Sequence, residues 1–247
     1  MTKRAIAIVS AAALVPALAA GAAGAAGAAV AAIAAAGPAS GATSSAAASA
    51  ADAHPGFHAT TSTVPEDYRA QMIGVSWKPG CPVPIDDLRI ITMNHWGFDG
   101  TVHEGGRLMV HKDVAAAVTE AFGDAFDARF PIRRIELIEA YGADDDASMA
   151  ADNTSAFNCR PITGTTDRFS IHSYGKAIDI NTVENPYVKG STVLPPAGAD
   201  YLDRTDVRPG MITKNDVVVK AFRDAKMAWG GDYNSLKDYQ HFEARKF

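Results

Sequence analysis

The chain has 247 residues, 47% of them hydrophobic and 21% charged, and its formal net charge is −5 at pH 7. This acidic balance excludes the basic surface through which proteins usually bind nucleic acids, so we expect no nucleic-acid partner. The length allows a domain with a substantial hydrophobic core.

The N-terminus has the layout of an export signal. Lys3 and Arg4 precede an uncharged run of small residues that continues through Ala20, as in secretory signal peptides. We therefore expect a signal peptide over residues 1–20, with its cleavage site left open, and a secreted or cell-envelope protein. An uncleaved membrane anchor is the alternative, because about 20 uncharged residues can span a bilayer, but Ala and Gly drive insertion only weakly.

The next segment, 21–56, is rich in Ala, Gly and Ser and shows neither a core pattern nor turn signals. Such a composition is typical of a disordered, flexible spacer. We therefore expect one folded domain over residues 57–247, and we expect it to be a monomer.

Short strands are predicted first in this domain. Residues 88–93 are strand-like, and Phe98-Asp99-Gly100 predicts a turn before a second short strand over 101–103. Gly105-Gly106 is expected to break the chain before a third strand, 107–111. This pattern predicts a meander of antiparallel strands.

A helix should follow these strands. Asp113 can cap it, and Pro131 should end it. Residues 135–141 are then predicted to form a strand, because Ile135 and Leu137 alternate with a polar residue. The helix itself is indicated by apolar residues at every fourth position: Val114, Val118, Phe122, Phe126 and Phe130.

Two irregular segments dominate the second half of the chain. Residues 143–169 are polar, and residues 182–210 are rich in Pro and Gly; neither shows periodicity. We expect both to be long loops, which often carry function, and the second could form the wall of a cleft. Residues 176–181 between them are predicted to form a strand.

The C-terminal part is predicted to contain one more helix and one more strand. Asn215 or Asp216 can cap the helix, which should continue through Trp229 and end at Gly230-Gly231. A short strand over 239–243 follows. Strands and helices do not alternate regularly, which predicts an α+β fold with a small antiparallel sheet and flanking helices.

Two cysteines, Cys81 and Cys159, occur in a chain that is expected to be exported from the cytoplasm. Thiols oxidise to disulfides in the compartments outside it. We therefore expect a disulfide between them. The alternatives are two free buried thiols or metal ligation, for which the spacing does not fit a zinc motif.

Residues 170–179 suit a metal site. His172 lies at the end of a predicted loop and Asp179 within the next strand. Strand alternation places Gly175 and Ala177 on the same face as Asp179, so its neighbours are small and leave room for a metal and a substrate backbone.

A second imidazole, His241, follows Asp238 by three residues near the C-terminus. Zinc held by two imidazoles and one carboxylate keeps a fourth position for water, which is typical of a catalytic centre. We therefore predict a Zn²⁺ site at His172, Asp179 and His241, with Asp238 moving the proton. Glu243 is the rival base, because it shares a face with His241 if the strand is regular.

The pattern Ser-x-His-x-x-Gly-x-Ala-x-Asp with a late Asp-x-x-His resembles the zinc D-alanyl-D-alanine carboxypeptidase family, which includes vancomycin-resistance dipeptidases and L-alanyl-D-glutamate endopeptidases. The resemblance implies the metal-site fold shared with hedgehog proteins. It also implies a peptidase of peptidoglycan stem peptides, the same ligands and base, and substrate contact by Ser170. Release of a terminal D-Ala and cleavage between L-Ala and D-Glu both fit.

One departure concerns the substrate carboxylate. Relatives commonly have an arginine after the tyrosine at position 141, where this chain has Gly142. Arg160 is our preferred substitute, ahead of Arg168, because a guanidinium matches a carboxylate well. The competing function is a metal-stabilised cell-wall binding module without turnover, which would be expected to have a disabled base.

Overall fold

The computed structural model describes residues 56–162 and 165–244. The signal peptide expected over 1–20, and the spacer up to residue 55, lie outside the described residues. Within the described part, none of the helices combines the length and hydropathy needed to cross a bilayer.

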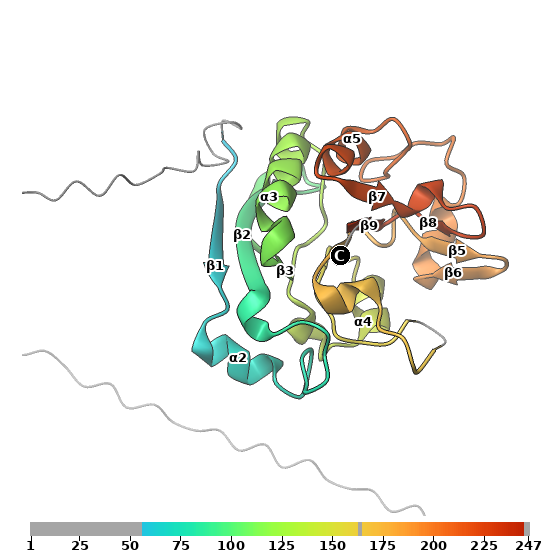
Figure 1. Ribbon diagram of the computed structural model, residues 1–247. Coiled ribbons are helices and arrows are strands. Elements are labelled where there is room, and N and C mark those ends of the chain that lie inside the picture. The colour runs from blue at the N-terminus through green and yellow to red at the C-terminus, as the bar shows by residue number, and fades with distance from the viewer. Residues whose placement is uncertain (1–55, 163–164, 245–247) are drawn as a thin grey trace, which may run out of the picture. The chain divides into compact units, whose positions relative to one another are not determined.

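The first half of the fold is built on an antiparallel sheet with strand order β1-β2-β3 (Figure 1). The break predicted at Gly105-Gly106 is wrong, because β3 continues through both glycines. The ladder with β2 instead shifts register between Met93 and His95. Gly105, with φ of 77°, adopts the left-handed backbone beside this irregularity at no steric cost. The elements are β1 (Ala59–Thr63), α2 (Glu66–Met72), η1 (Ile85–Asp87), β2 (Leu88–Trp96) and β3 (Val102–His111).

The helix α3 (Lys112–Asp127) follows β3 directly and packs against β2 and α5. Its cap is His111 rather than the expected Asp113, because the imidazole Nδ1 of His111 accepts the backbone N–H of Asp113. The helix ends before Phe130, yet that side chain is still buried with the apolar face of the helix.

The strand predicted over 135–141 is wrong. Ile135 forms only an isolated bridge with Thr154, residues 136–137 are irregular, and a 3₁₀ helix follows, η2 (Ile138–Tyr141). The two predicted long loops also contain regular structure. Asp144 accepts the backbone N–H of Ala147 and so caps a helix within the first loop. The elements in the two segments are α4 (Asp145–Ala150), β5 (Tyr187–Lys189), β6 (Thr192–Leu194) and η4 (Pro196–Tyr201).

Two further small sheets complete the fold, with strand orders β4-β9-β7 and β6-β5-β8. Asp216 caps α5, but the helix ends before Trp229, because Lys226 adopts a left-handed φ of 63°. Trp229 instead pairs with Phe242 in a strand. The elements are η3 (Ile171–Tyr174), β4 (Ala177–Asp179), α5 (Val217–Asp224), β7 (Met227–Trp229), η5 (Gly230–Asp232), β8 (Lys237–Asp238) and β9 (His241–Ala244).

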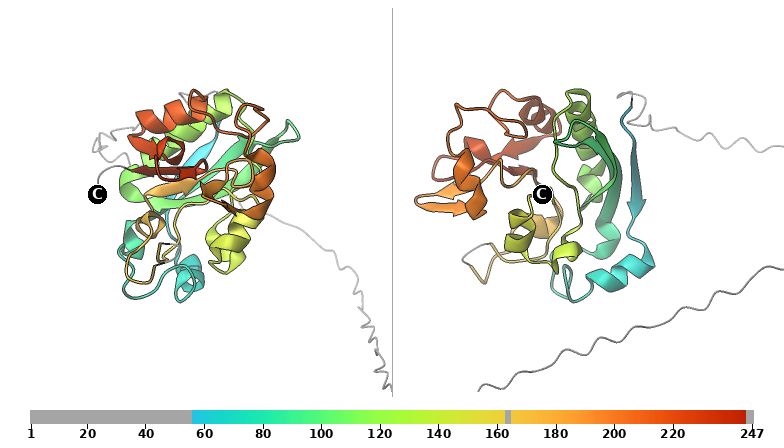
Figure 2. Two further views of the ribbon diagram at one scale, coloured as in Figure 1. Left: turned by 90° about the vertical axis from the view of Figure 1, so that its right-hand side faces the viewer. Right: turned by 180° about the vertical axis from the view of Figure 1, so that it is seen from behind.

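A shared hydrophobic core joins the helices to the strands that carry the candidate site. Phe222 of α5 contacts Phe122 of α3 edge to face, and it stacks on Phe242 of β9 with 4.5 Å between the ring centroids. Ile178 of β4 is completely buried in the same core. The views place the β1–β3 sheet and the β5–β6 hairpin on opposite sides, with β9 between them (Figures 1 and 2). The α+β class is confirmed.

Candidate metal centre

The structure brings together His172, Asp179 and His241, which lie on three different elements. His172 belongs to η3, where Ser170 Oγ accepts the backbone N–H of His172 at 3.4 Å. Asp179 ends β4 and is the cross-strand partner of His241, the first residue of β9. All three side chains are buried, and Ile178 and Phe242, on the opposite faces of β4 and β9, anchor these two strands in the core.

The ligating atoms of the trio have the spacing of a metal site. His172 Nε2 lies 3.2 Å from Asp179 Oδ2, His241 Nδ1 lies 2.9 Å from Asp179 Oδ1, and the two nitrogens are 3.3 Å apart. Tetrahedral zinc with bonds of about 2.0–2.1 Å separates its ligand atoms by roughly 3.3 Å. Within the described ranges, no other group of His, Cys, Asp and Glu meets this clustering. The residues therefore fit a metal ion.

Hydrogen bonds orient both imidazoles toward the centre of the trio. His172 Nδ1 lies 2.7 Å from the carbonyl oxygen of Ala156, to which it donates, so its Nε2 is free to ligate. His241 directs Nδ1 at Asp179, while its Nε2 lies 3.4 Å from Glu243 Oε2. The two histidines thus present different ring nitrogens to the same point.

The close approach also shapes the electrostatics. Burial by itself would raise the pKa of Asp179, but the adjacent imidazoles of His172 and His241 hold it far below its ordinary value. Burial would lower the pKa of His241, but hydrogen bonds to Asp179 and Glu243 raise it to about 10. The trio therefore stabilises positive charge, and a divalent cation supplies such charge.

Asp238 lies beside the trio because the chain turns between β8 and β9. Asp238 ends β8, which pairs with β5, and residues 239–240 turn the chain into β9, which pairs with β4. Burial raises the pKa of Asp238 to about 6, with the imidazole of His241 opposing the rise and the carboxylate of Asp179 adding to it. Its Oδ1 has no hydrogen-bond partner among the described residues.

Asp238 and the trio line one cavity of about 260 Å³, and Ser170 and Arg160 line it as well. Arg160 Nη2 is ion-paired with Asp145 Oδ2 at 2.7 Å, while its buried Nε has no partner among the described residues. Arg168 is exposed and does not line this cavity. At position 142 the backbone is left-handed, with φ of 61°, which favours glycine over arginine.

Several lining residues were not predicted. The segment 182–210, expected as a possible cleft wall, contributes through the β5–β6 hairpin, where Tyr187 and Lys189 share a face; period-two alternation was the available signal. The other unpredicted contributions come from α4, from the segment that follows Arg160 and from the segments around β8. The residues missed are Asp145, Met149, Ile162, Tyr187, Lys189, Leu194, Leu236 and Gln240.

The expected disulfide is present between Cys81 and Cys159, whose Cα atoms are 6.0 Å apart. Cys159 also donates its backbone N–H to the carbonyl oxygen of Ser76. The next residue, Arg160, exchanges hydrogen bonds with Ser173 of η3. The disulfide therefore anchors the segment that positions both Arg160 and the helix carrying His172.

The comparison with protein families agrees with this geometry. Residues 163–244 match the family model described as D-alanyl-D-alanine carboxypeptidase, which supports a peptidase. No curated protein and no solved structure gives a significant match. The matched region contains both motifs and all four of His172, Asp179, Asp238 and His241, and the resemblance of this chain to the zinc D-alanyl-D-alanine carboxypeptidase family is thereby confirmed.

Proposed function

We propose that the chain is a secreted zinc metallopeptidase that hydrolyses peptide bonds in peptidoglycan stem peptides, with residues 57–247 as its catalytic domain. The observation that carries this proposal is the meeting of three candidate ligands and the half-buried Asp238 in one cavity. The family match supports the peptide substrate.

His172, Asp179 and His241 would hold the metal. When bound, zinc lowers the pKa of water to roughly 7 and polarises a carbonyl oxygen. Asp238 would take the proton as water attacks the scissile carbonyl and pass it to the leaving amine. Its pKa, raised by burial, suits a group that both accepts and donates a proton near neutral pH.

Ser170 and Arg160 would contact the substrate, because both line the cavity. Ser170 Oγ accepts from the backbone of His172, which leaves its hydroxyl hydrogen available to a peptide carbonyl. The guanidinium of Arg160 offers donors to a substrate carboxylate beyond the one that faces Asp145. A stem peptide has such carboxylates whether the enzyme acts as a carboxypeptidase or as an endopeptidase.

The disulfide and the N-terminal sequence support export. Structural disulfides form in oxidising compartments, and Cys81 and Cys159 are bonded here. We propose that residues 1–20 direct secretion, that residues 21–56 act as a spacer, and that any membrane attachment is through the N-terminal segment. Cell fractionation of the full-length chain, followed by N-terminal sequencing, would show whether the signal is cleaved.

Peptidoglycan digestion tests the catalytic proposal. The purified zinc-loaded protein is incubated with purified peptidoglycan, and the released products are resolved by mass. Loss of a single alanine from the stem indicates a carboxypeptidase, and fragments beginning with D-Glu indicate an endopeptidase. Release of neither product by wild-type protein with stoichiometric zinc would reject the enzyme in favour of a metal-stabilised binding module.

A further inference from the structure

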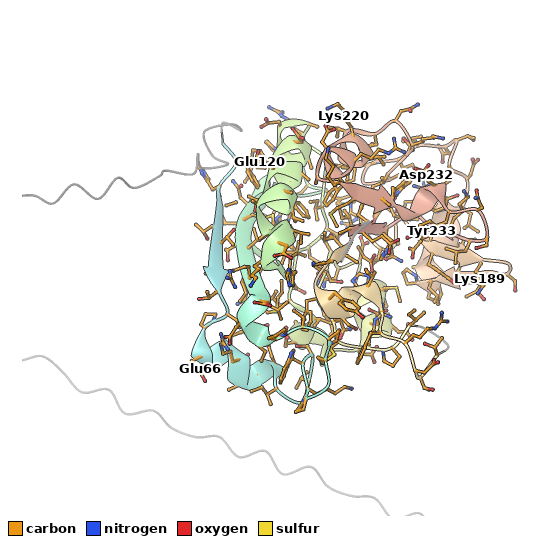
Figure 3. All side chains as sticks on the ribbon, viewed as in Figure 1. Glu66, Glu120, Lys189, Lys220, Asp232 and Tyr233 are labelled. Carbon is orange, nitrogen blue, oxygen red and sulfur yellow. A yellow bond between two sulfur atoms is a disulfide. The ribbon has the colours of Figure 1, made fainter. Side chains whose placement is uncertain are left out.

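Glu243 connects His241 to a second side chain behind the candidate metal centre. Glu243 Oε2 lies 3.4 Å from His241 Nε2, and Glu243 Oε1 accepts a hydrogen bond from the hydroxyl of Tyr233 at 2.8 Å. Each carboxylate oxygen therefore has its own partner. Tyr233 directly follows η5 and lies among the C-terminal elements (Figure 3).

The fold places Glu243 there through strand geometry. His241 and Glu243 are two residues apart in β9, so their side chains share a face. The cross-strand partners of Glu243 are alanines on both sides, Ala228 in β7 and the fully buried Ala177 in β4, whose single methyl groups leave space for the longer side chain. The small residue that the sequence suggested would make room beside Asp179 thus also makes room for Glu243.

This contact distinguishes the two nitrogens of His241. A neutral imidazole carries a hydrogen on one nitrogen and a lone pair on the other. Without a metal, both nitrogens face a carboxylate, Asp179 at Nδ1 and Glu243 at Nε2. With a metal ion held at Asp179, the hydrogen of the neutral ring is favoured at Nε2, where Glu243 accepts it, and the lone pair of Nδ1 is left for the metal. In His172 the roles of the two nitrogens are exchanged: the carbonyl oxygen of Ala156 accepts the hydrogen on Nδ1, which leaves the lone pair on Nε2. In both histidines, a hydrogen bond at the nitrogen that faces away from the metal would then fix the tautomer that can ligate.

The same geometry separates Glu243 from the proposed proton transfer. Glu243 lies across the His241 ring from the ligating atoms and does not line the cavity that contains Asp238. Its two oxygens are engaged by His241 and Tyr233. A group in this position acts through the ligand rather than on the substrate.

We propose that Glu243, itself held by Tyr233, is a positioning residue that selects Nδ1 of His241 as the ligating atom and so raises the affinity of the site for zinc. The inference rests on the proposed function only in placing the metal at the trio. It assigns Glu243 a role other than that of the rival base.

Zinc affinity tests this assignment without any substrate. The affinity of the full-length protein is measured by competition with a chromogenic chelator for wild type, Glu243→Leu, Glu243→Gln and Tyr233→Phe. Loss of an outer partner of a ligating histidine typically costs 10–100-fold in metal affinity. We expect that loss for Glu243→Leu, a change within about threefold for Glu243→Gln, whose amide oxygen still accepts from Nε2, and an intermediate loss for Tyr233→Phe. The matched control is Glu104→Leu on the exposed part of β3.

A spectroscopic measurement keeps the test decisive if Glu243→Leu fails to fold. In zinc-loaded wild type labelled with ¹⁵N-histidine, the ring of His241 should carry its hydrogen on Nε2. A hydrogen on Nδ1, or undiminished affinity in folded Glu243→Leu, overturns the inference. Failure of wild type to bind zinc overturns both this inference and the proposed function, whereas tight zinc binding without peptide cleavage rejects the proposed function alone.

Discussion

Asp179 and His241 are direct cross-strand partners in β4 and β9, and their side chains meet with 2.9 Å between Oδ1 and Nδ1. Backbone pairing, rather than a flexible loop, therefore sets the distance between two of the three candidate ligands. Asp238 is placed differently, because it depends on the turn between two sheets.

Replacing Asp238 with asparagine should abolish turnover while leaving zinc in place. The change keeps the shape of the side chain but removes its capacity to accept a proton, and general acid–base groups typically contribute 10²–10⁴-fold to rate. The measurements are kcat on a stem peptide and zinc content of the purified variant. Asp232→Asn, on the surface of η5, should behave as wild type. Full activity of Asp238→Asn would assign the base elsewhere.

A methyl group at Gly230 should misplace Asp238. A Cβ there would lie 2.5 Å from the carbonyl oxygen of Asp238 and 2.8 Å from its Cβ, so the β8 backbone must move. Because small displacements of a catalytic group can cost up to 10²-fold, we expect Gly230→Ala to lower kcat at least tenfold, with zinc affinity nearly unchanged.

The control for this change is Asn234→Ala, at an exposed position nearby. Equal kcat values for Gly230→Ala and wild type would show that β8 absorbs the methyl group without moving the carboxylate. A parallel loss of zinc would instead indicate that the whole of the trio had shifted.

Glu184 should make stability depend on pH. Burial and its hydrogen bond with Asp152 raise the pKa of Glu184 from 4.5 to about 7. Between these values the unfolded chain has lost the proton that the native protein retains, so the free energy of unfolding should fall as pH rises through this window. Glu184→Gln removes the titrating carboxyl group, so the free energy of unfolding of the variant should depend less on pH.

Urea unfolding at several pH values between 4 and 8 measures the effect. The difference in unfolding free energy between Glu184→Gln and wild type should grow in favour of the variant as pH rises, and level off above about pH 7. Glu104→Gln, which is exposed, should follow the wild-type profile. Parallel profiles for wild type and Glu184→Gln would contradict the assignment.

Removing the disulfide should destabilise the fold. Cys81 and Cys159 are 78 residues apart, for which the chain-entropy model gives about 4.5 kcal/mol, and measured losses are typically 2–5 kcal/mol. The double variant Cys81→Ala/Cys159→Ala and reduced wild type should both show this loss in urea unfolding. Unchanged stability in both would mean that native packing alone holds residues 159–160.

Local patterns were sufficient where the physical cause is local. The spacing from His172 to Asp179 and the alternation of small and apolar residues in β4 follow from strand periodicity, and both were readable in the sequence. The predictions of the helix caps also depended on local contacts. Asp216 caps α5 as predicted, whereas α3 is capped by His111, two residues before the predicted Asp113.

Distant pairing decided the elements that the sequence misassigned. The apolar spacing of α5 extends to Trp229, but that residue belongs to a strand because β9 offers Phe242 as its partner. The segment 135–141 alternates like a strand, yet it has only an isolated bridge to Thr154 and turns into a 3₁₀ helix.

The sequence by itself determined which side chains are candidates for the metal site, namely His172, Asp179 and His241, together with their motif spacing and the family that those motifs resemble. Only the tertiary structure determined where Asp238 and Glu243 lie relative to these three side chains. Their positions depend on β8 pairing with β5 while β9 pairs with β4, because Asp238 then lines the cavity and Glu243 lies beside Nε2 of His241, outside that lining. Hydrogen bonds between strands distant in sequence set these positions, and no local pattern encodes them.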